Sequence, residues 1–497
     1  MNNIQSLRLF IPELIIVVTI LIGIIADLIY SRNKSFKVGY WILGGLILSL
    51  FAVLMHDEHN VLTLFTDMVT LDPFAVLLKV IILISTILVV IISRYNNEFE
   101  NYRTGEYHIL IAITVFGMML MVSAVDILLI YLAIEIVSIM SFVLAGYLKQ
   151  NKRSNESALK YVIYGAFSSG LMLFGMSILF GMTGSTKLYL IANSLAQLGP
   201  AANFAMIIAL VLILAGFAYK ISVVPFHFWT PDVYEGAPTT ITAFLSVAPK
   251  AAGFALLIRF FHIVFGDAGA IQAGNWITLT DLPWGQILAL LAVLTMTLGN
   301  VVAIQQSNIK RMLAYSSIAH AGYMLMVIPV LSTESIFAIA FYLFVYTIMN
   351  LGAFFVVIAV KNETGGETFD DYTGIGWRMP LIGVIMTIFM FSLTGLPPTA
   401  GFIGKFYLFA ALIKGGPQFY WLAFVGVINS VISLYYYMRV VKVMYFDGDS
   451  QKELARPVLP ITSILIVLAF ATILFGIYWA PLSDWIRNSL IFYISSL

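Results

Sequence analysis

The sequence contains no cysteine and very little charge. The absence of cysteine among 497 residues excludes disulfide bonds, thiolate iron–sulfur ligation and a catalytic thiol. Charged residues make up 10% of the chain, whereas a soluble domain carries about 25%. A net charge of +1 gives no attraction for nucleic acid. Because 61% of the residues are hydrophobic, we predict an all-α polytopic membrane protein.

Long apolar runs recur along the whole chain and predict about fourteen membrane-spanning helices. The first run lasts to Leu28 and contains no small-residue cleavage site, so we expect a retained span rather than a signal peptide. The predicted spans are 9–30, 38–55, 73–93, 108–123, 125–148, 157–182, 203–235, 238–265, 285–304, 309–330, 333–360, 378–414, 419–446 and 458–480.

The seventh and twelfth spans are too long for one straight crossing, and both contain interior proline. Pro225 lies in the seventh span, and Pro397 and Pro398 lie in the twelfth. Interior proline removes a backbone hydrogen bond and breaks a helix, so we expect both helices to be discontinuous. The breaks are five spans apart, so spans 4–8 and 9–13 are predicted to be two inverted five-helix repeats. Paired broken helices in inverted repeats point to a transport site near the membrane midplane.

These repeats divide the chain into four parts. Residues 1–104 are predicted to be an N-terminal three-helix segment, 105–265 the first repeat, 285–446 the inverted second repeat, and 447–497 a C-terminal helix and tail. The polar stretch 361–378 is the longest predicted inner loop, which we expect to be solvated and placed to contact a partner.

Basic residues indicate how the spans are oriented. With the N-terminus outside, seventeen of the 26 lysines and arginines lie on the inner side, five lie outside and four lie within spans. This bias follows the positive-inside rule. We therefore predict a multi-pass protein of a prokaryotic cell membrane with both termini outside.

Four charged residues lie deep within predicted spans: Glu135, Lys220, Lys250 and Lys405. A charge at the centre of a membrane helix costs about 2.5–3.5 kcal/mol on insertion scales, so such residues usually mark ion or proton pathways. Glu135 is about ten residues into its span, and therefore about 15 Å deep.

Glu135 and Lys220 are predicted to form a switchable pair. Lys220 lies five residues before Pro225, and a broken helix frees carbonyl groups and admits water, which allows a lysine at this depth. Moving a carboxylate and an ammonium group apart changes the proton affinity of both, as a gated proton relay requires. The alternative is a structural salt bridge that fixes helix packing.

The other deep lysines extend this relay. Lys250 is placed to carry a proton onward from Lys220, and Lys405, the last deep charge before the C-terminal spans, is expected to be the exit group. Lys79 lies six residues after Pro73, and we expect a structural role in which its side chain reaches the outer interface.

Two histidines are possible relay residues, because histidine changes charge near neutral pH. His227 follows Lys220 by seven residues and shares its helical face if the helix resumes; a packing role is the alternative for either histidine. His320 has hydroxyl groups nearby in sequence, on Ser316, Ser317 and Tyr323.

Two acids lie at the inner mouth of the seventh span. Asp232 and Glu235 either collect protons or cap the helix that begins near Pro238. No histidine pair has metal-ligand spacing, and no glycine-rich loop follows a strand. We therefore predict neither a metal nor a cofactor in this chain.

Several stretches carry a family likeness. Residues 220–259 read KISVVPFHFWTPDVYEGAPTTITAFLSVAPKAAGFALLIR. This stretch resembles the antiporter-like proton-translocating subunits of respiratory complex I (NADH-quinone oxidoreductase), and its VYEGAP variant and Lys250 resemble subunit N (subunit 2) specifically. Residues 11–28, 105–147, 308–326 and 395–409 are similar to the same subunit, so the likeness covers essentially the whole chain.

The resemblance implies a fold of fourteen spans with inverted repeats and a role for each deep charge. It implies that Glu135 pairs with Lys220, that Lys250 is the connecting lysine and that Lys405 is the terminal lysine. His227 and His320 match histidines of the family. It also implies that NADH, flavin, iron–sulfur clusters and quinone are bound by partner subunits, so quinone acts only indirectly.

The sequence therefore predicts a proton-translocating membrane-arm subunit of NADH-quinone oxidoreductase. Its expected partners are membrane lipid and other membrane-arm subunits, including M and K. One alternative is a free-standing cation/proton antiporter, although three deep lysines against one deep acid favour protons. Others are the equivalent subunit of a ferredoxin-, formate- or hydrogenase-linked complex, or a structural role in the membrane arm.

Overall fold

The computed structural model describes residues 3–56, 61–100, 102–197, 203–272, 275–278, 282–447 and 459–495. Thirteen described helices are long and apolar enough to span a membrane, and the count reaches fourteen with one bent pair that includes α16. The prediction of an all-α polytopic membrane protein is confirmed.

The helices of the first half follow the predicted spans, with short additions at α1 and α8 and with the seventh span divided between α9 and α10. They are α1 (Asn3–Leu9), α2 (Ile11–Ile29), α3 (Val38–Leu54), α4 (Pro73–Ser93), α5 (Gly105–Ser123), α6 (Ile127–Ala145), α7 (Lys152–Thr183), α8 (Leu188–Gln197), α9 (Asn203–Ile221), α10 (Trp229–Gly236) and α11 (Thr239–Phe265).

The second half adds α15 and α20 to the predicted spans. Its helices are α12 (Trp284–Ile304), α13 (Ile309–Leu325), α14 (Thr333–Thr364), α15 (Ile375–Arg378), α16 (Pro380–Thr394), α17 (Ala400–Lys414), α18 (Tyr420–Tyr445), α19 (Leu459–Ile477) and α20 (Ala480–Ser495). Five short 3-10 turns also occur among the described residues, including η2 (Asn97–Phe99) and η5 (Asp370–Tyr372). Two antiparallel hairpins pair β1 (Leu62–Leu64) with β2 (Val69–Leu71), and β3 (Gly266–Gln272) with β4 (Asn275–Thr278).

The predicted break in the seventh span is present. Helix α9 ends at Ile221 and α10 begins at Trp229. Between them Ser222 has a φ of 64°, and the Val224–Pro225 peptide is cis. The intervening chain is not helical, because proline cannot supply the backbone hydrogen bond that would continue α9.

The predicted break in the twelfth span is also present. Helix α16 ends at Thr394, and Gly395 has a φ of 89°, which L side chains rarely adopt. A Cβ atom at Gly395 would also lie 2.8 Å from Lys405 Cδ, so the backbone angle favours glycine and a larger residue would displace the Lys405 side chain. The Pro397–Pro398 peptide is cis, and α17 begins at Ala400.

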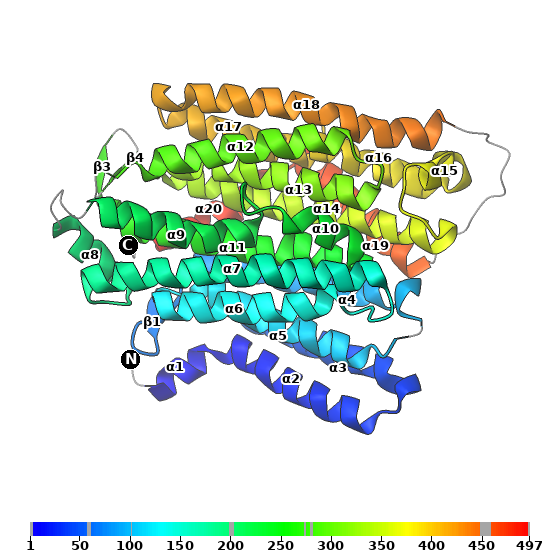
Figure 1. Ribbon diagram of the computed structural model, residues 1–497, viewed down its shortest axis with the longest axis horizontal. Coiled ribbons are helices and arrows are strands. Elements are labelled where there is room, and N and C mark those ends of the chain that lie inside the picture. The colour runs from blue at the N-terminus through cyan, green and yellow to red at the C-terminus, as the bar shows by residue number, and fades with distance from the viewer. Residues whose placement is uncertain are drawn as a thin grey trace.

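The long helices run side by side in one bundle, with α2 and α3 at one edge and α18 at the opposite edge (Figure 1). Helix α11 lies in the interior, where it packs against α4, α5, α9 and α14. Its most apolar 18-residue window is entirely buried. Helices α1 and α20 both reach the left-hand end of the bundle (Figure 1), as an even number of crossings requires. The repeat boundaries and the membrane orientation stay predictions.

The stretch 361–378 was expected to be a solvated loop, and it is only partly so, because Glu363, Thr368 and Asp370 are exposed while other residues are buried. Lys361 belongs to the last turn of α14, and η5 and α15 follow. Tyr372 and Ile375 are fully buried, and Glu367 is 9% exposed. Apolar residues among the polar ones, together with ion pairs formed by Lys361 and Glu367, hold this stretch against the bundle.

Candidate functional site

Lys220 lies next to the last residue of α9, where the helix dipole favours a cation. Its Nζ donates to Ser138 Oγ in α6 at 3.3 Å. Glu135 lies one helical turn before Ser138 and interacts electrostatically with Lys220. One Glu135 oxygen is buried without a hydrogen-bond partner among the described residues. The predicted pair is therefore close, but the ammonium group bonds to a hydroxyl rather than to the carboxylate.

Lys250 lies in the middle of α11 and is 1% exposed. Its Nζ donates to the Ser317 carbonyl at 2.9 Å and to Ser317 Oγ at 2.6 Å. Tyr346 in α14 donates to the same Ser317 hydroxyl at 2.8 Å, and the Tyr234 ring lies 5.9 Å from Nζ. Lys250 is thus held by neutral oxygens and aromatic rings at the meeting point of α11, α13 and α14.

Helix α11 differs on the two sides of Lys250. Before it, Thr239, Thr242 and Ser246 recur every three or four residues and are fully buried, which places them on one helical face with Lys250. Asn350 in α14 donates to Ser246 Oγ at 2.7 Å, and its own Oδ1 is buried without a partner among the described residues.

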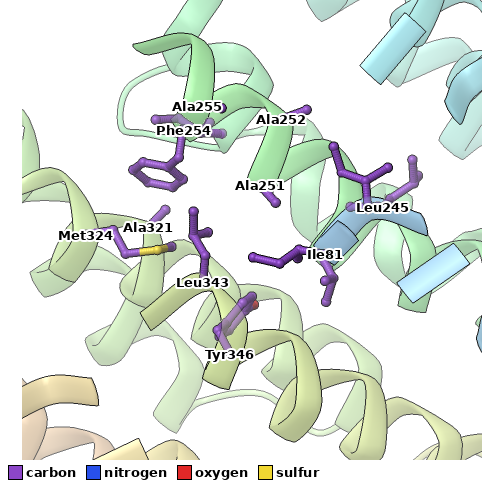
Figure 2. Packing of buried hydrophobic residues seen from close by; sticks show 14 of the residues in the cluster. Ile81, Leu245, Ala251, Ala252, Phe254, Ala255, Ala321, Met324, Leu343 and Tyr346 are labelled. Carbon is purple, nitrogen blue, oxygen red and sulfur yellow. The ribbon is translucent and has the colours of Figure 1, made fainter. Parts of the chain in front are cut away.

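After Lys250, residues 251–258 read AAGFALLI and are all apolar. Figure 2 shows the Phe254 ring pointing toward Ala321 and Met324, with Leu343 beside them. Close packing of this kind has no polar partner for water or a proton. The half of α11 before Lys250 thus carries hydroxyl groups on the face that bears Lys250, whereas the residues directly after Lys250 are apolar.

His320 in α13 is 1% exposed and bonded through both ring nitrogens. Nδ1 is 2.6 Å from the Tyr342 hydroxyl and Nε2 is 2.9 Å from the Tyr437 hydroxyl. Of the hydroxyl partners expected from sequence, Tyr323 contacts the ring only edge-on, with centroids 5.8 Å apart. The expected partners on the same helix are therefore wrong, because tyrosines of the neighbouring helices α14 and α18 form the hydrogen bonds to the ring.

Lys405 lies in α17, and its ammonium group reaches back across the break. Nζ donates to the carbonyl of Thr394, the last residue of α16, at 2.8 Å and to Ser430 Oγ at 3.0 Å. The Tyr323 ring lies 4.9 Å from Nζ. Lys405 therefore supplies a cation to the carboxyl end of α16, where the helix dipole favours one, as Lys220 does for α9.

His227 does not share a helical face with Lys220. It is buried within the non-helical segment between α9 and α10, where its ring lies 4.4 Å from that of Phe228. The spacing argument fails because the helix resumes only at Trp229.

Asp232 and Glu235 are both engaged in ion pairs. Asp232 contacts Lys160 at 2.7 Å and Arg311 at 2.5 Å, and Glu235 contacts Arg311 at 3.0 Å. Neither caps α11, because the Thr239 amide donates to Glu98 instead, at 2.7 Å. The capping alternative is therefore wrong, and proton collection stays a prediction.

A cluster of four charges at the Thr239 end of α11 was not found from sequence. Lys361 is paired with Glu98 at 2.6 Å and also with Glu367. Lys310 is paired with Glu367 at 3.2 Å and donates to the Ala237 carbonyl at 2.8 Å. Lys361 and Glu98 are 263 residues apart in sequence, so no local pattern connects them. We call Glu98, Lys310, Lys361 and Glu367 the end cluster.

The end cluster holds its acids in the ionised form. Burial alone would raise the pKa of Glu98, but the Lys310 and Lys361 ammonium groups, with hydrogen bonds from Lys361 and Asn96, lower the pKa to about 2. The pKa of Glu367 is lowered for the same reason, against the effect of its burial. The arrangement is that of a fixed ionic contact.

Two further buried ion pairs join the N-terminal helices to the bundle. Lys79 pairs with Glu13 at 2.6 Å, so its side chain ends in a carboxylate contact and does not reach the outer interface as expected. Arg259 donates to both oxygens of Asp72, at 2.7 and 3.1 Å. Asp72 also accepts from the Ala75 amide at the start of α4.

Sequence reasoning also missed Tyr342, Tyr346 and Asn350, although a signal for them exists. They recur at a spacing of four within an otherwise apolar span, which places them on one helical face. The described residues hold no group of three or more histidine, cysteine, aspartate or glutamate side chains that would suit a metal ion.

Comparison with known proteins identifies the family. Residues 124–433 match the family described as NADH:quinone oxidoreductase/Mrp antiporter, transmembrane. NADH-quinone oxidoreductase subunit N of Chlorobium chlorochromatii is 46% identical, and the alignment covers 97% of this chain and 94% of that protein.

Solved structures agree with this assignment. A chain of respiratory complex I from Thermus thermophilus superposes with a TM-score of 0.78 at 27% identity, covering 95% of this chain and 98% of that chain. A chain of the Mrp complex from Dietzia sp. shares the fold, with a TM-score of 0.80 at 18% identity and 99% of each chain covered. The resemblance to subunit N is confirmed, and the chain belongs to the NADH:quinone oxidoreductase/Mrp antiporter transmembrane family.

Proposed function

We propose that this chain is the proton-translocating membrane-arm subunit of an NADH-quinone oxidoreductase, with Glu135, Lys220, Lys250 and Lys405 as its proton relay. The observation that carries this proposal is the set of contacts around the lysines. All three are at most 4% exposed, and all three ammonium groups donate to hydroxyl or carbonyl oxygens.

Such contacts suit a group that must gain and lose protons. A lysine bound to a serine hydroxyl can release a proton and keep its hydrogen bond as a neutral amine, because the hydroxyl both donates and accepts. A lysine paired with a buried carboxylate cannot, because its deprotonation would leave an uncompensated buried charge. One carboxylate, that of Glu135, lies near these lysines. It lies beside Lys220 without bonding to it, as a switchable pair requires.

The two halves of α11 support a direction for proton entry. The hydroxyl-bearing half connects Lys250 to the Thr239 end, which is the inner side in the predicted orientation, and the apolar half closes the outer side.

Moving one charge against 100 mV costs about 2.3 kcal/mol. That energy would come from quinone reduction in partner subunits, which would hold the NADH, flavin, iron–sulfur and quinone sites. Subunits M and K would be among the membrane-arm partners.

Proton pumping by the assembled complex tests the proposal. Complexes carrying Glu135→Gln, Lys220→Ala or Lys405→Ala would be reconstituted in proteoliposomes, with quinone reduction measured separately in the presence of an uncoupler. We expect each variant to lose pumping. Lys187→Ala, in a partly exposed ion pair with Asp67, is the matched control and should pump normally. Unchanged pumping in all three relay variants would show that the relay assignment is wrong.

The rival function is cation/proton antiport, and the same vesicles distinguish it. If the chain carried sodium, an imposed sodium gradient would move protons without NADH, and Lys250→Ala would abolish that movement. We expect no such sodium-driven proton movement, because a row of buried ammonium groups repels a metal cation.

A further inference from the structure

His320 links two tyrosine hydroxyls into a continuous hydrogen-bonded chain. Tyr342 in α14 contacts Nδ1, Tyr437 in α18 contacts Nε2, and the Tyr437 hydroxyl is also bonded to Ser316 Oγ in α13. All four side chains are at most 1% exposed. Four groups with exchangeable hydrogens therefore connect three helices in the buried interior.

The two ends of this chain lie beside two relay lysines. Ser316 directly precedes Ser317, which holds the Lys250 ammonium group. At the other end the Tyr342 ring packs on Gly404, where a Cβ atom would lie 2.6 Å from Tyr342 Cδ2. Gly404 directly precedes Lys405. The chain from Ser316 to Tyr342 thus spans the interval between the Lys250 and Lys405 sites.

The hydrogen bonds of His320, one hydroxyl at each ring nitrogen, suit a neutral ring. The titratable groups that face it are Tyr323 on its own helix, Tyr342 and Tyr346 in α14, Tyr437 in α18, and the ammonium groups of Lys250 in α11 and Lys405 in α17. Both lysines act on it by charge repulsion. A neutral imidazole has one donor and one acceptor nitrogen, which matches one hydroxyl on each side.

We propose that Tyr342 and Tyr437 are proton-carrying residues of the relay, and that His320 passes each proton as a neutral ring by exchanging the nitrogen that bears its hydrogen. This inference rests on the proposed function, which it extends by two residues and by the form of the transfer.

Every transfer in this step is balanced. A proton from the Lys250 ammonium group reaches Ser316 through Ser317 or water, and Ser316 passes its own hydroxyl proton to Tyr437. Tyr437 then passes its proton to Nε2 while Nδ1 releases its hydrogen to Tyr342. Tyr342 passes its proton through water to a neutral Lys405 amine. One O–H or N–H bond breaks at each group as another forms, no electron moves, and reorientation of the ring and hydroxyls restores the start.

Removal of single hydroxyl groups tests the chain in the assembled complex. We expect Tyr342→Phe and Tyr437→Phe to lose proton pumping to the same extent as Lys405→Ala measured in parallel, with quinone reduction under uncoupled conditions retained. Tyr147→Phe is the control, because Tyr147 is also buried and its hydroxyl donates to the Arg103 carbonyl, away from this hydrogen-bonded chain. It should pump like the wild type.

The outcomes separate this inference from the proposed function. If both tyrosine variants pump normally while Lys405→Ala does not, the tyrosines do not carry protons. The proposed relay through the buried lysines is then still supported. If Lys405→Ala also pumps normally, the proposed function is wrong.

The protonation of the two His320 ring nitrogens can be measured in a complex that keeps both tyrosine hydroxyls. Nitrogen NMR of the complex labelled at histidine, with His320→Gln as the subtraction, should show one protonated and one bare ring nitrogen between about pH 6 and pH 8. Two protonated nitrogens in that range would overturn the neutral-ring transfer, even where a tyrosine variant fails to assemble.

Discussion

Two sets of buried lysines differ in their partners and not in their depth. Lys220, Lys250 and Lys405 are 3%, 1% and 4% exposed, and Lys79 and Lys310 are 3% and 1% exposed. The first set donates to hydroxyl and carbonyl oxygens, whereas the second is paired with carboxylates. We call them the hydroxyl-bound and the carboxylate-bound lysines.

The difference shows that burial of a charge does not by itself indicate function. A carboxylate partner fixes a lysine in its charged form, since loss of either charge strands the other in a low-dielectric interior. Hydroxyl and carbonyl partners impose no such requirement. Removal of a carboxylate-bound lysine should therefore affect stability first, and removal of a hydroxyl-bound lysine should affect proton transfer first.

The largest expected effect is the loss of pumping in Lys250→Met. Methionine fills much of the space of the lysine stem, and Ser317 keeps its hydrogen bond from Tyr346. We expect pumping by the reconstituted complex to be abolished, with the free energy of unfolding changed by less than about 1 kcal/mol. A large loss of stability without loss of pumping per assembled complex would remove the distinction between the two sets.

Next in size is Lys79→Met, which should destabilise the chain by about 3–5 kcal/mol because it leaves the Glu13 carboxylate buried and unpaired. Thermal denaturation in detergent measures the change. The double variant Glu13→Gln/Lys79→Met is the control and should recover most of the loss, while complexes that assemble should pump normally. A double variant as unstable as the single one would contradict the ion-pair explanation.

A smaller effect is expected from acid on the end cluster. The folded-state pKa of Glu98 is about 2, below its ordinary value of 4.5, so its ionised form stabilises the fold above about pH 4.5. That contribution, about 3 kcal/mol at most, is lost as the pH falls toward 2. The free energy of unfolding, measured by denaturation at several pH values in this range, should fall less steeply with decreasing pH for Glu98→Gln than for the wild type. Identical slopes would show that Glu98 is not held ionised.

The smallest effect is expected where an ion pair is half exposed. Arg487 in α20 contacts Glu334 in α14 at 3.1 and 3.3 Å. Because solvent and salt screen such a pair, Glu334→Gln should destabilise the chain by about 1 kcal/mol or less, and by still less at high salt. A loss of stability as large as that of Lys79→Met would show that solvent exposure does not determine how much an ion pair contributes to stability.

The sequence predicted the elements of the fold well because their causes are local. Apolar runs of membrane length located the spans, and Pro225 and the pair Pro397–Pro398 located both breaks. The depth of Lys220, Lys250 and Lys405 followed from their place in those runs. His227 was misplaced because a helical spacing was carried across residues that are not helical.

The partners of those lysines could not be predicted in the same way. Lys220 bonds to Ser138, 82 residues away, and Lys250 bonds to Ser317, 67 residues away. No periodicity connects residues of different spans. The end cluster was missed for the same reason, and the burial of part of residues 361–378 was therefore not expected.

The sequence by itself determined that the chain crosses the membrane many times, where two helices break and which charges lie deep, since hydropathy and proline act over a single span. Only the tertiary structure decided which buried lysines meet a carboxylate and which meet a hydroxyl. That choice depends on which helices pack together, and it sets whether a buried charge is fixed or free to exchange its proton.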